Sequence, residues 1–206
     1  MALVVRCRGE RNPAEQTSTT DITKAPKPQD AAALATVTGG ATGTFNNDRM
    51  TGNSGNNSFD AGAGDDSVRG HEGNDSILGG DGTGQLFGDS GNDTINGGAG
   101  SDIIEGGSGA DVLNGDDAWG AQGDDQFIWS PGGGNDTING GGGSDLLVLE
   151  DTGLTLQQLL NAINETSTLQ ARIVGSSIDL TGVMGSIRIG NETISFSQME
   201  RLMIRS

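Results

Sequence analysis

A large apolar residue recurs every nine positions through the middle of the chain. In the first eight repeats it is Met50, Phe59, Val68, Ile77, Leu86, Ile95, Ile104 and Leu113. Five extra residues near Asp117 and two more near Ser130 then shift the series to Phe127, Ile138 and Leu147. A period kept from residue 50 to residue 147 predicts a repeat architecture rather than one ordinary globular core.

A polar position lies two residues before each of these apolar residues. It is aspartate at Asp48, Asp66, Asp75, Asp93, Asp102, Asp111, Asp125, Asp136 and Asp145, and it is otherwise Asn57 or Gly84. Strand alternation would turn the apolar side chain inward and its two neighbours outward, and the glycines between strands suit turns with positive φ. The pattern predicts an all-β fold, a parallel β-roll in which two nonapeptides make each turn of a right-handed coil.

The period divides the chain into three parts. Residues 1–36 show no hydrophobic period and predict a flexible tail, residues 43–148 form the roll, and residues 150–206 form an α+β cap. In the cap, Thr155 is expected to begin a helix whose apolar face is Leu156, Leu159, Leu160 and Ile163. Alternating runs at 177–180, 186–189 and 193–196 predict strands.

Negative charge is concentrated in the repeat. The net charge is −17, and residues 70–171 hold seventeen Asp or Glu and no Lys or Arg. This charge disfavours nucleic acids and anionic membranes as partners and favours cations. Aromatic residues make up only 3% of the chain, and no apolar run approaches the roughly 18 residues that would span a membrane.

Stacking the predicted coils brings aspartates together. Residues eighteen apart would lie above one another, which places Asp75, Asp93 and Asp111 in one column and Asp48, Asp66, Gly84 and Asp102 in another. Two carboxylates ~5 Å apart repel by ~3 kcal/mol at an effective dielectric near 20. Half a dozen such contacts amount to ~15–20 kcal/mol, which matches or exceeds the ~5–15 kcal/mol net stability of a domain.

A cation between the carboxylates would remove this repulsion. Ca²⁺ tolerates about seven loosely arranged oxygen ligands, whereas Mg²⁺ demands a stricter geometry. Zinc is disfavoured because the chain has one histidine, His71, and one cysteine, Cys7, far apart in sequence. We therefore expect several Ca²⁺ ions, held by the nine aspartates and by carbonyl oxygens of the glycine turns.

Three segments, GGAGSDIIE, GGSGADVLN and AGAGDDSVR, resemble the nonapeptide repeat of the RTX family. The resemblance covers roughly residues 43–148. It implies a calcium-binding β-roll that folds on binding Ca²⁺, and export by a type I secretion system that reads an uncleaved C-terminal signal. The start MALVVRCRGER lacks the apolar core of a signal peptide, which agrees with that route. We expect a secreted or cell-surface bacterial protein.

The sequence also departs from the repeat at three places. Gly84 replaces an aspartate, so the sites beside it are expected to be weak. Asn57 and the imperfect repeat at residues 43–51 indicate a frayed first end, and the insertion around Trp119 is expected to divide the array.

No catalytic site is expected. The segment GDSGN at residues 88–92 resembles a protease serine motif, but a triad needs a positioned base and His71 occupies only a variable repeat position. Acid pairs such as Asp65-Asp66 are explained by the repeat. Three functions stay open: a structural calcium-binding protein, the C-terminal module of a larger secreted protease, lipase or epimerase, and a surface adhesin or ice-binding module.

Overall fold

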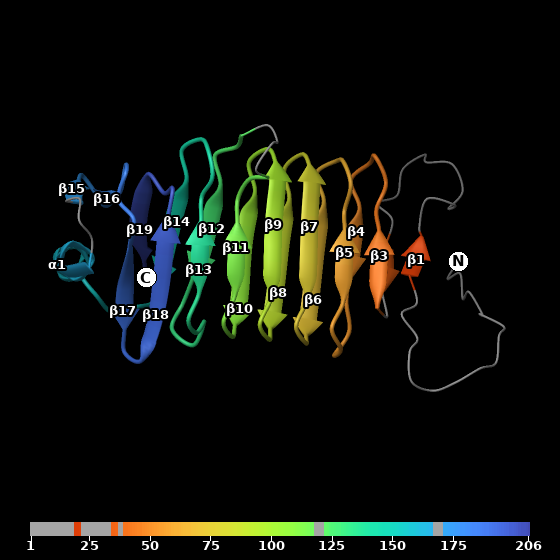
Figure 1. The fold of residues 1–206 in the computed structure, drawn as a ribbon, viewed down its shortest axis with the longest axis horizontal. Helices are drawn as coiled ribbons and strands as arrows, with labels where there is room; N and C mark the ends of the chain where they lie inside the picture. Colours follow the sequence, from red (N-terminus) through yellow and green to blue (C-terminus); the bar gives the residue numbers. More distant parts are fainter. Residues whose placement is uncertain (1–18, 22–33, 37–38, 118–121, 167–170) are drawn as a thin grey trace.

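Two sheets of mainly parallel strands lie face to face and form a long roll, closed at the C-terminal end by a helix and further strands (Figure 1). This computed structural model describes residues 19–21, 34–36, 39–117, 122–166 and 171–206. Cys7, Trp119 and most of the predicted tail lie outside the described residues. The predicted parallel β-roll with an α+β cap is confirmed.

From β1 to β14, successive strands of the chain fall in opposite sheets. Sheet A has the order β1 (Thr19–Asp21), β3 (Gly40–Thr42), β5 (Ser58–Asp60), β7 (Ser76–Asp81), β9 (Thr94–Ala99), β11 (Val112–Asn114), β13 (Thr137–Asn139), β18 (Glu192–Ser197) and β17 (Gly185–Ile189). Sheet B has the order β15 (Arg172–Val174), β16 (Ser177–Asp179), β19 (Arg201–Arg205), β14 (Leu146–Glu150), β12 (Gln126–Trp129), β10 (Ile103–Ser108), β8 (Gln85–Ser90), β6 (Ser67–Glu72), β4 (Arg49–Thr51) and β2 (Leu34–Thr36). Each nonapeptide therefore makes half of one coil.

The register between strands follows the predicted repeat. Phe59 lies opposite Ile77, the equivalent residue of the next coil in the same sheet. Across the insertion near Asp117, Ile104 lies opposite Phe127, so the five extra residues are accommodated outside the strands. The predicted positions of both insertions are thus confirmed, since Leu113 also lies opposite Ile138. The expectation that the first insertion divides the array is wrong, because β10 pairs with β12 and β11 pairs with β13 across it.

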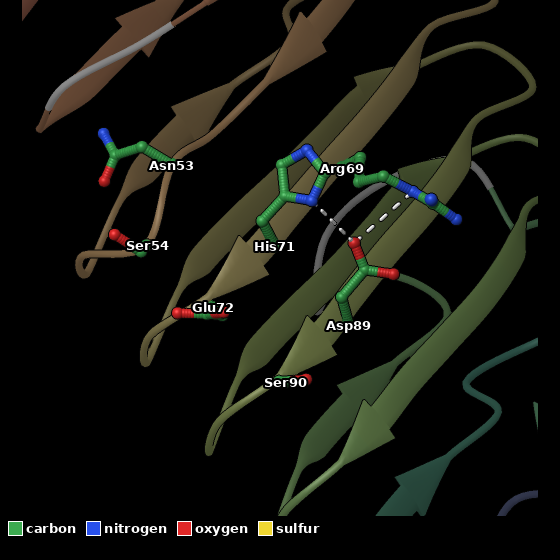
Figure 2. A pocket seen from close by; sticks show the side chains of 7 residues that line it. All are labelled: Asn53, Ser54, Arg69, His71, Glu72, Asp89 and Ser90. Atoms are coloured by element: carbon green, nitrogen blue, oxygen red, sulfur yellow. Dashed lines mark ion pairs between the residues drawn. The ribbon is translucent and has the colours of Figure 1, made fainter.

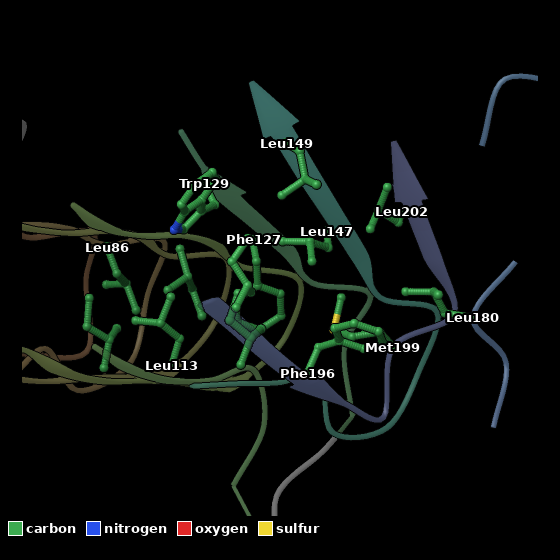
Figure 3. Close-up of a cluster of buried hydrophobic side chains, with 14 of the residues drawn as sticks. Leu86, Leu113, Phe127, Trp129, Leu147, Leu149, Leu180, Phe196, Met199 and Leu202 are labelled. Carbon is green, nitrogen blue, oxygen red and sulfur yellow. The ribbon is translucent and has the colours of Figure 1, made fainter. Parts of the chain in front are cut away.

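The core is a double row of stacked apolar side chains between the sheets. Every member of the nine-residue series from Met50 to Leu147 is buried. Figure 3 shows this row at the cap end, where Phe127 and Leu147 are followed by Phe196 and Leu202 of the cap. Since full burial of one such side chain stabilises a fold by roughly 1.5–3 kcal/mol, this row is the main apolar contribution to the roll.

Several strands are longer than the three residues expected from the repeat. Strands β6 to β10 each span six residues, because pairing continues into the glycine turn. Gly80 lies opposite Gly98, which has a φ of 102°, and a Cβ on Gly98 would overlap the carbonyl oxygen of Gly80. Both the backbone angle and the stacking distance thus require glycine at this position.

The cap contains the predicted helix, α1 (Leu156–Thr166). Gln158 N donates to Thr155 Oγ1 at 3.3 Å, and Thr155 N donates to Gln158 Oε1 at 2.9 Å, which is a reciprocal capping box. Leu159 and Ile163 of the predicted apolar face are fully buried. Among the described residues, no helix has the length and apolar character to cross a membrane.

The cap also continues both sheets of the roll. Strand β18 pairs in parallel with β13, and strand β19 pairs in parallel with β14, with Leu202 opposite Leu147. The nine-residue period had indicated an end at Leu147. Parallel stacking nevertheless extends by one further coil, because Phe196 and Leu202 occupy the inward positions that the repeat apolar residues hold.

At the other end, two segments of the predicted tail lie against the roll. Strand β1 pairs with β3, and strand β2 pairs with β4, both in parallel. Ala41 is buried nine residues before Met50, so the inward series begins one position earlier than expected. The division into tail, roll and cap remains a prediction.

Candidate metal centre

The polar positions of the repeat form two columns, one along each edge of the roll. The first-edge column contains Asp48, Asp66, Gly84, Asp102, Asp125 and Asp145, and the second-edge column contains Asn57, Asp75, Asp93, Asp111 and Asp136. All nine predicted aspartates are at most 4% exposed. The structure therefore brings the predicted residues together in the expected columns, and metal binding by them remains a prediction.

One carboxylate oxygen of each stacked aspartate is part of the backbone scaffold. Asp75 N donates to Asp93 Oδ1 at 2.7 Å, and Asp93 N donates to Asp111 Oδ1 at 2.8 Å. The same bond joins Asp102 N to Asp125 Oδ1 at 2.8 Å on the first edge. These hydrogen bonds hold consecutive coils in register and fix the orientation of each carboxylate.

The other oxygen of most of these carboxylates is buried without a partner. The unpartnered Oδ2 atoms belong to Asp66, Asp75, Asp93, Asp102, Asp111, Asp125 and Asp145. A buried ionised oxygen that accepts no hydrogen bond is strongly destabilising, and native folds pair such charges or coordinate them to metals. Seven such atoms in two columns are the arrangement expected of carboxylates that bind cations.

Carbonyl oxygens of the glycine turns face these unpartnered atoms. A Cβ added to Gly88 would overlap Asp93 Oδ2 and would lie 2.5 Å from the carbonyl oxygen of Gly106. A Cβ on Gly97 would overlap Asp102 Oδ2 and would lie 2.6 Å from the carbonyl oxygen of Gly115. Two acceptors that face one space left open only by glycine fit a cation, and an all-oxygen donor set suits Ca²⁺.

Side chains alone do not complete these sites. Within the described part of the chain, no three His, Cys, Asp or Glu side chains converge as a group able to hold a metal ion. The carbonyl oxygens of the glycine turns are the further ligands expected at these sites.

Burial raises the pKa of the column carboxylates. It raises the pKa of Asp93, Asp102, Asp125 and Asp136 to about 7 and that of Asp66 and Asp145 to about 6, and it also raises the pKa of Asp75 and Asp111. For Asp93 the largest cause is desolvation, the backbone hydrogen bond from Asp75 opposes it, and the neighbouring aspartates add to it. Desolvation therefore raises the pKa of Asp93 more than repulsion between neighbouring carboxylates does, although the sequence predicted repulsion as the main effect.

Two predicted ligands differ from the other seven. Asp48 Oδ2 accepts hydrogen bonds from Thr44 N at 2.7 Å and from Thr44 Oγ1 at 2.8 Å, so this carboxylate is already satisfied locally. Asp136 is buried but has no oxygen that is both buried and unpartnered. The first-edge column therefore has no free carboxylate oxygen at Asp48, which lies in the imperfect first repeat.

The structure adds a second ladder that the sequence did not predict. In several repeats the side chain of the residue before the polar position accepts a hydrogen bond from a backbone N–H of the following coil, opposite in direction to the aspartate ladder. Thr83 N donates to Asp65 Oδ1 at 3.0 Å, and Asn92 N donates to Asn74 Oδ1 at 2.8 Å. The recurring Asn and Asp before the slot were the available signal. Acid pairs such as Asp65-Asp66 thus combine an outer scaffold residue with an inner carboxylate.

The protease-like segment lies beside a surface hollow of about 520 Å³. Figure 2 shows Asp89 between Arg69 and His71, at 3.4 Å from Arg69 Nε and 3.6 Å from His71 Nδ1. Arg69 also lies 5.3 Å from the ring centroid of Phe87. Surface ion pairs of this kind contribute about 0–1 kcal/mol, and we assign this cluster a local structural role.

The comparison with known families agrees with this geometry. A family model described as the RTX calcium-binding nonapeptide repeat, in four copies, matches residues 42–77, 78–113 and 132–150. These ranges contain eight of the nine predicted aspartates, whereas Asp125 and strand β12 lie between the second and third range. No curated protein matches the chain. RTX nonapeptide repeats bind Ca²⁺, and residues 42–113 and 132–150 of this β-roll match that repeat.

Proposed function

We propose that the chain is a secreted calcium-binding β-roll protein whose roll folds when Ca²⁺ binds after export. The observation that carries the proposal is the set of seven buried, unpartnered Oδ2 atoms in two columns. At a cytosolic ~10⁻⁷ M Ca²⁺ these charges would oppose folding, and at the 10⁻⁴–10⁻³ M to which extracellular modules respond they would be neutralised. The ligands are the nine aspartates named above together with turn carbonyls.

The folding switch can be tested by far-UV circular dichroism of the metal-free chain during titration with CaCl₂ and, in parallel, MgCl₂. We expect a cooperative rise of β signal at submillimolar to millimolar Ca²⁺, without the same response to Mg²⁺. A chain that is fully folded in EDTA, or that does not respond to Ca²⁺, would contradict the proposal.

Two adjacent aspartates provide a matched pair of variants. Asp125 is buried with an unpartnered Oδ2, whereas Asp124 is exposed and accepts Ser144 N at 2.8 Å. Asp125→Asn should raise the Ca²⁺ midpoint by at least about tenfold, because it removes one ligand charge, and Asp124→Asn should leave the midpoint within about twofold. Equal midpoints for the two variants would argue against the inner column as the binding site.

Export by a type I secretion system is the second part of the proposal, and it is supported by the family resemblance. A bacterial strain that carries such an apparatus should release the full chain into the medium. A chain ending at Glu150 should be retained in the cells, because the proposed signal lies in residues 150–206. Release of the truncated chain would contradict that assignment.

An ice-binding or adhesive role is a second candidate, and the outward face of sheet A favours it. Asn96, Asn114 and Asn139 lie in register on consecutive strands, with Thr94, Val112 and Thr137 beside them. Growth of ice crystals that is unchanged by the calcium-loaded chain would remove the ice-binding form of this candidate.

A further inference from the structure

We propose that the cap completes one additional cation site, formed by Asp145 of the roll and by Gln198 and Glu200 of the cap. The inference rests on the proposed calcium-binding function and extends it beyond the repeats, because the family match ends at residue 150. Glu200 and Gln198 lie in the turn between β18 and β19, outside every nonapeptide.

Glu200 takes the place of an aspartate in the first-edge column. Asp145 N donates to Glu200 Oε2 at 2.7 Å, as Asp125 N donates to Asp145 Oδ1 at 2.9 Å one coil earlier. Arg201 N donates to the carbonyl oxygen of Asp145 at 3.0 Å, as Leu146 N donates to that of Asp125 at 2.8 Å. The carboxylate ladder therefore passes from roll to cap without interruption.

Length explains why this position is glutamate. Asn139 lies opposite Ser197, and Leu146 lies opposite Arg201. The roll turn between these partners contains residues 140–145, whereas the cap turn contains only residues 198–200. The extra methylene of Glu200 lets a shorter turn present its carboxylate at the same backbone N–H.

An unpartnered oxygen points into this junction. Asp145 is fully buried, and its Oδ2 has no hydrogen-bond partner. A Cβ on Gly140 would overlap both Asp145 Oδ2 and the carbonyl oxygen of Gln198. A Cβ on Gly115 would overlap Asp125 Oδ2 and the carbonyl oxygen of Gly140 in the same way. Gln198 thus supplies the carbonyl that a turn glycine supplies inside the repeats.

The donor set at the junction is therefore the one found along the column, with hard oxygen ligands and no positive side chain among the three residues. An ion at this position would join β14 to β19 through ligands from both. Calcium would then order the cap together with the roll, since β18 and β19 carry the buried Phe196 and Leu202.

The test counts bound Ca²⁺ by equilibrium dialysis and elemental analysis at saturating calcium. Glu200→Gln should bind one ion fewer per chain than the unmodified chain. The matched control is Glu192→Gln, because Glu192 Oε2 also accepts a roll backbone N–H, that of Gly132 at 3.0 Å, from the neighbouring part of the cap. The control should bind the full number. Asp145→Asn and the double variant Asp145→Asn/Glu200→Gln should bind equal numbers of ions, because both substitutions would empty one shared site.

A second readout is hydrogen exchange of the β19 amides during the calcium titration. Protection of β19 should appear at the same Ca²⁺ concentration as that of β14, and Glu200→Gln should shift only β19 to higher concentration. If Glu200→Gln fails to fold, Glu200→Asp decides, because its carboxylate is one methylene too short for this turn: a folded chain that binds one ion fewer supports the site, and a folded chain with the full ion count overturns it. An unchanged ion count in Glu200→Gln overturns the inference while leaving the proposed function intact, whereas an unmodified chain that binds no Ca²⁺ overturns both.

Discussion

At the scale of single residues, seven of the nine column aspartates have two separate roles. Their Oδ1 accepts a backbone N–H of the adjacent coil, and their Oδ2 is left free toward the turn glycines, as for Asp93 and Asp111. The donor of this ladder bond is a backbone N–H, so Asn57 and Gly84 also serve as donors without a carboxylate. The free oxygen is what makes the position a candidate ligand.

Replacing Gly84 by aspartate would test the effect of adding a carboxylate to the first-edge column. Its N–H donates to Asp102 Oδ1 at 2.6 Å, as the aspartates of the column do, and its φ is not in the left-handed region. An added Cβ would lie 2.9 Å from Asp102 Oδ1, a contact that the other coils accommodate by a small shift. Gly84→Asp should lower the Ca²⁺ midpoint by about 3- to 10-fold, because it adds one ligand charge.

The control for this substitution is Thr83→Asp, which adds the same charge at the exposed outer position next to it. Circular dichroism during CaCl₂ titration measures both midpoints. An equal decrease for both variants would show that general charge, rather than the missing ligand, sets the affinity.

The raised pKa values predict how the metal-free chain depends on pH. Burial raises the pKa of Asp93 and Asp102 to about 7, above the usual value near 3.9, so folding favours their protonated forms. This contribution to stability is complete below about pH 4 and is lost as the pH rises through about 6 to 7. In EDTA the chain should therefore show more β signal at pH 5 than at pH 8.

Calcium should have the opposite dependence, since it competes with the protons. The Ca²⁺ midpoint is expected to decrease from pH 5 to pH 8, measured by titration at each pH. A midpoint that is the same at both pH values would indicate that the ligands are not the carboxylates with raised pKa.

At the scale of elements, the positive φ and the close stacking of the turns limit which residues can occupy the ends of the long strands. Strand pairing continues into the turns, where most coils have glycine and a Cβ would overlap the backbone of the neighbouring coil. His71 and Asp89 adopt φ values of 77° and 72° at positions where other coils have glycine, and they lie opposite one another in β6 and β8. Their side chains point outward into the hollow of Figure 2, where a Cβ is accommodated.

A pair of glycine substitutions separates backbone angle from stacking distance. Gly98 and Gly132 have φ values of 102° and 97°, but a Cβ on Gly98 would overlap Gly80 O, whereas nothing lies within 4 Å of a Cβ on Gly132. Gly132→Ala should destabilise the calcium-loaded chain by about 1–2 kcal/mol, from the angle alone. Gly98→Ala should cost at least about 2 kcal/mol more, measured by urea unfolding. Equal effects would show that stacking distance is unimportant.

At the scale of the whole molecule, the roll has a continuous double row of apolar side chains and two edge columns of carboxylates, which are interrupted only at Gly84 and preceded by Asn57. A single coil cannot form either feature, because the apolar side chains pack against the next coil and the ladder hydrogen bonds join consecutive coils. Folding should therefore be cooperative along the stack and should change the size of the chain, not only its local structure.

Small-angle X-ray scattering measures this change. The metal-free chain of 206 residues should approach the radius of gyration of an unfolded chain, about 49 Å. Saturating Ca²⁺ should reduce this value to about a third, because a compact domain of this length has a radius of gyration of roughly 17 Å. The same concentration of MgCl₂ is the control. A compact metal-free chain would contradict folding coupled to calcium.

The sequence by itself determined the repeat and what the repeat requires. A nine-residue period of aspartate and apolar positions specifies two sheets, an inward row and two edge columns, because strand alternation and glycine turns leave few other arrangements. The register across both insertions, the capped helix and the two columns of aspartates followed from that period and from Thr155.

Only the tertiary structure decided which oxygen of each aspartate is free and where the stack ends. Whether Oδ1 or Oδ2 meets a backbone N–H depends on a residue eighteen or more positions away, and no local pattern encodes that contact. Glu200 joins the column across 55 residues, through a shorter turn that carries no nonapeptide signature. Parallel pairing between β14 and β19 places it there, because strands distant in sequence become neighbours only when the sheet forms.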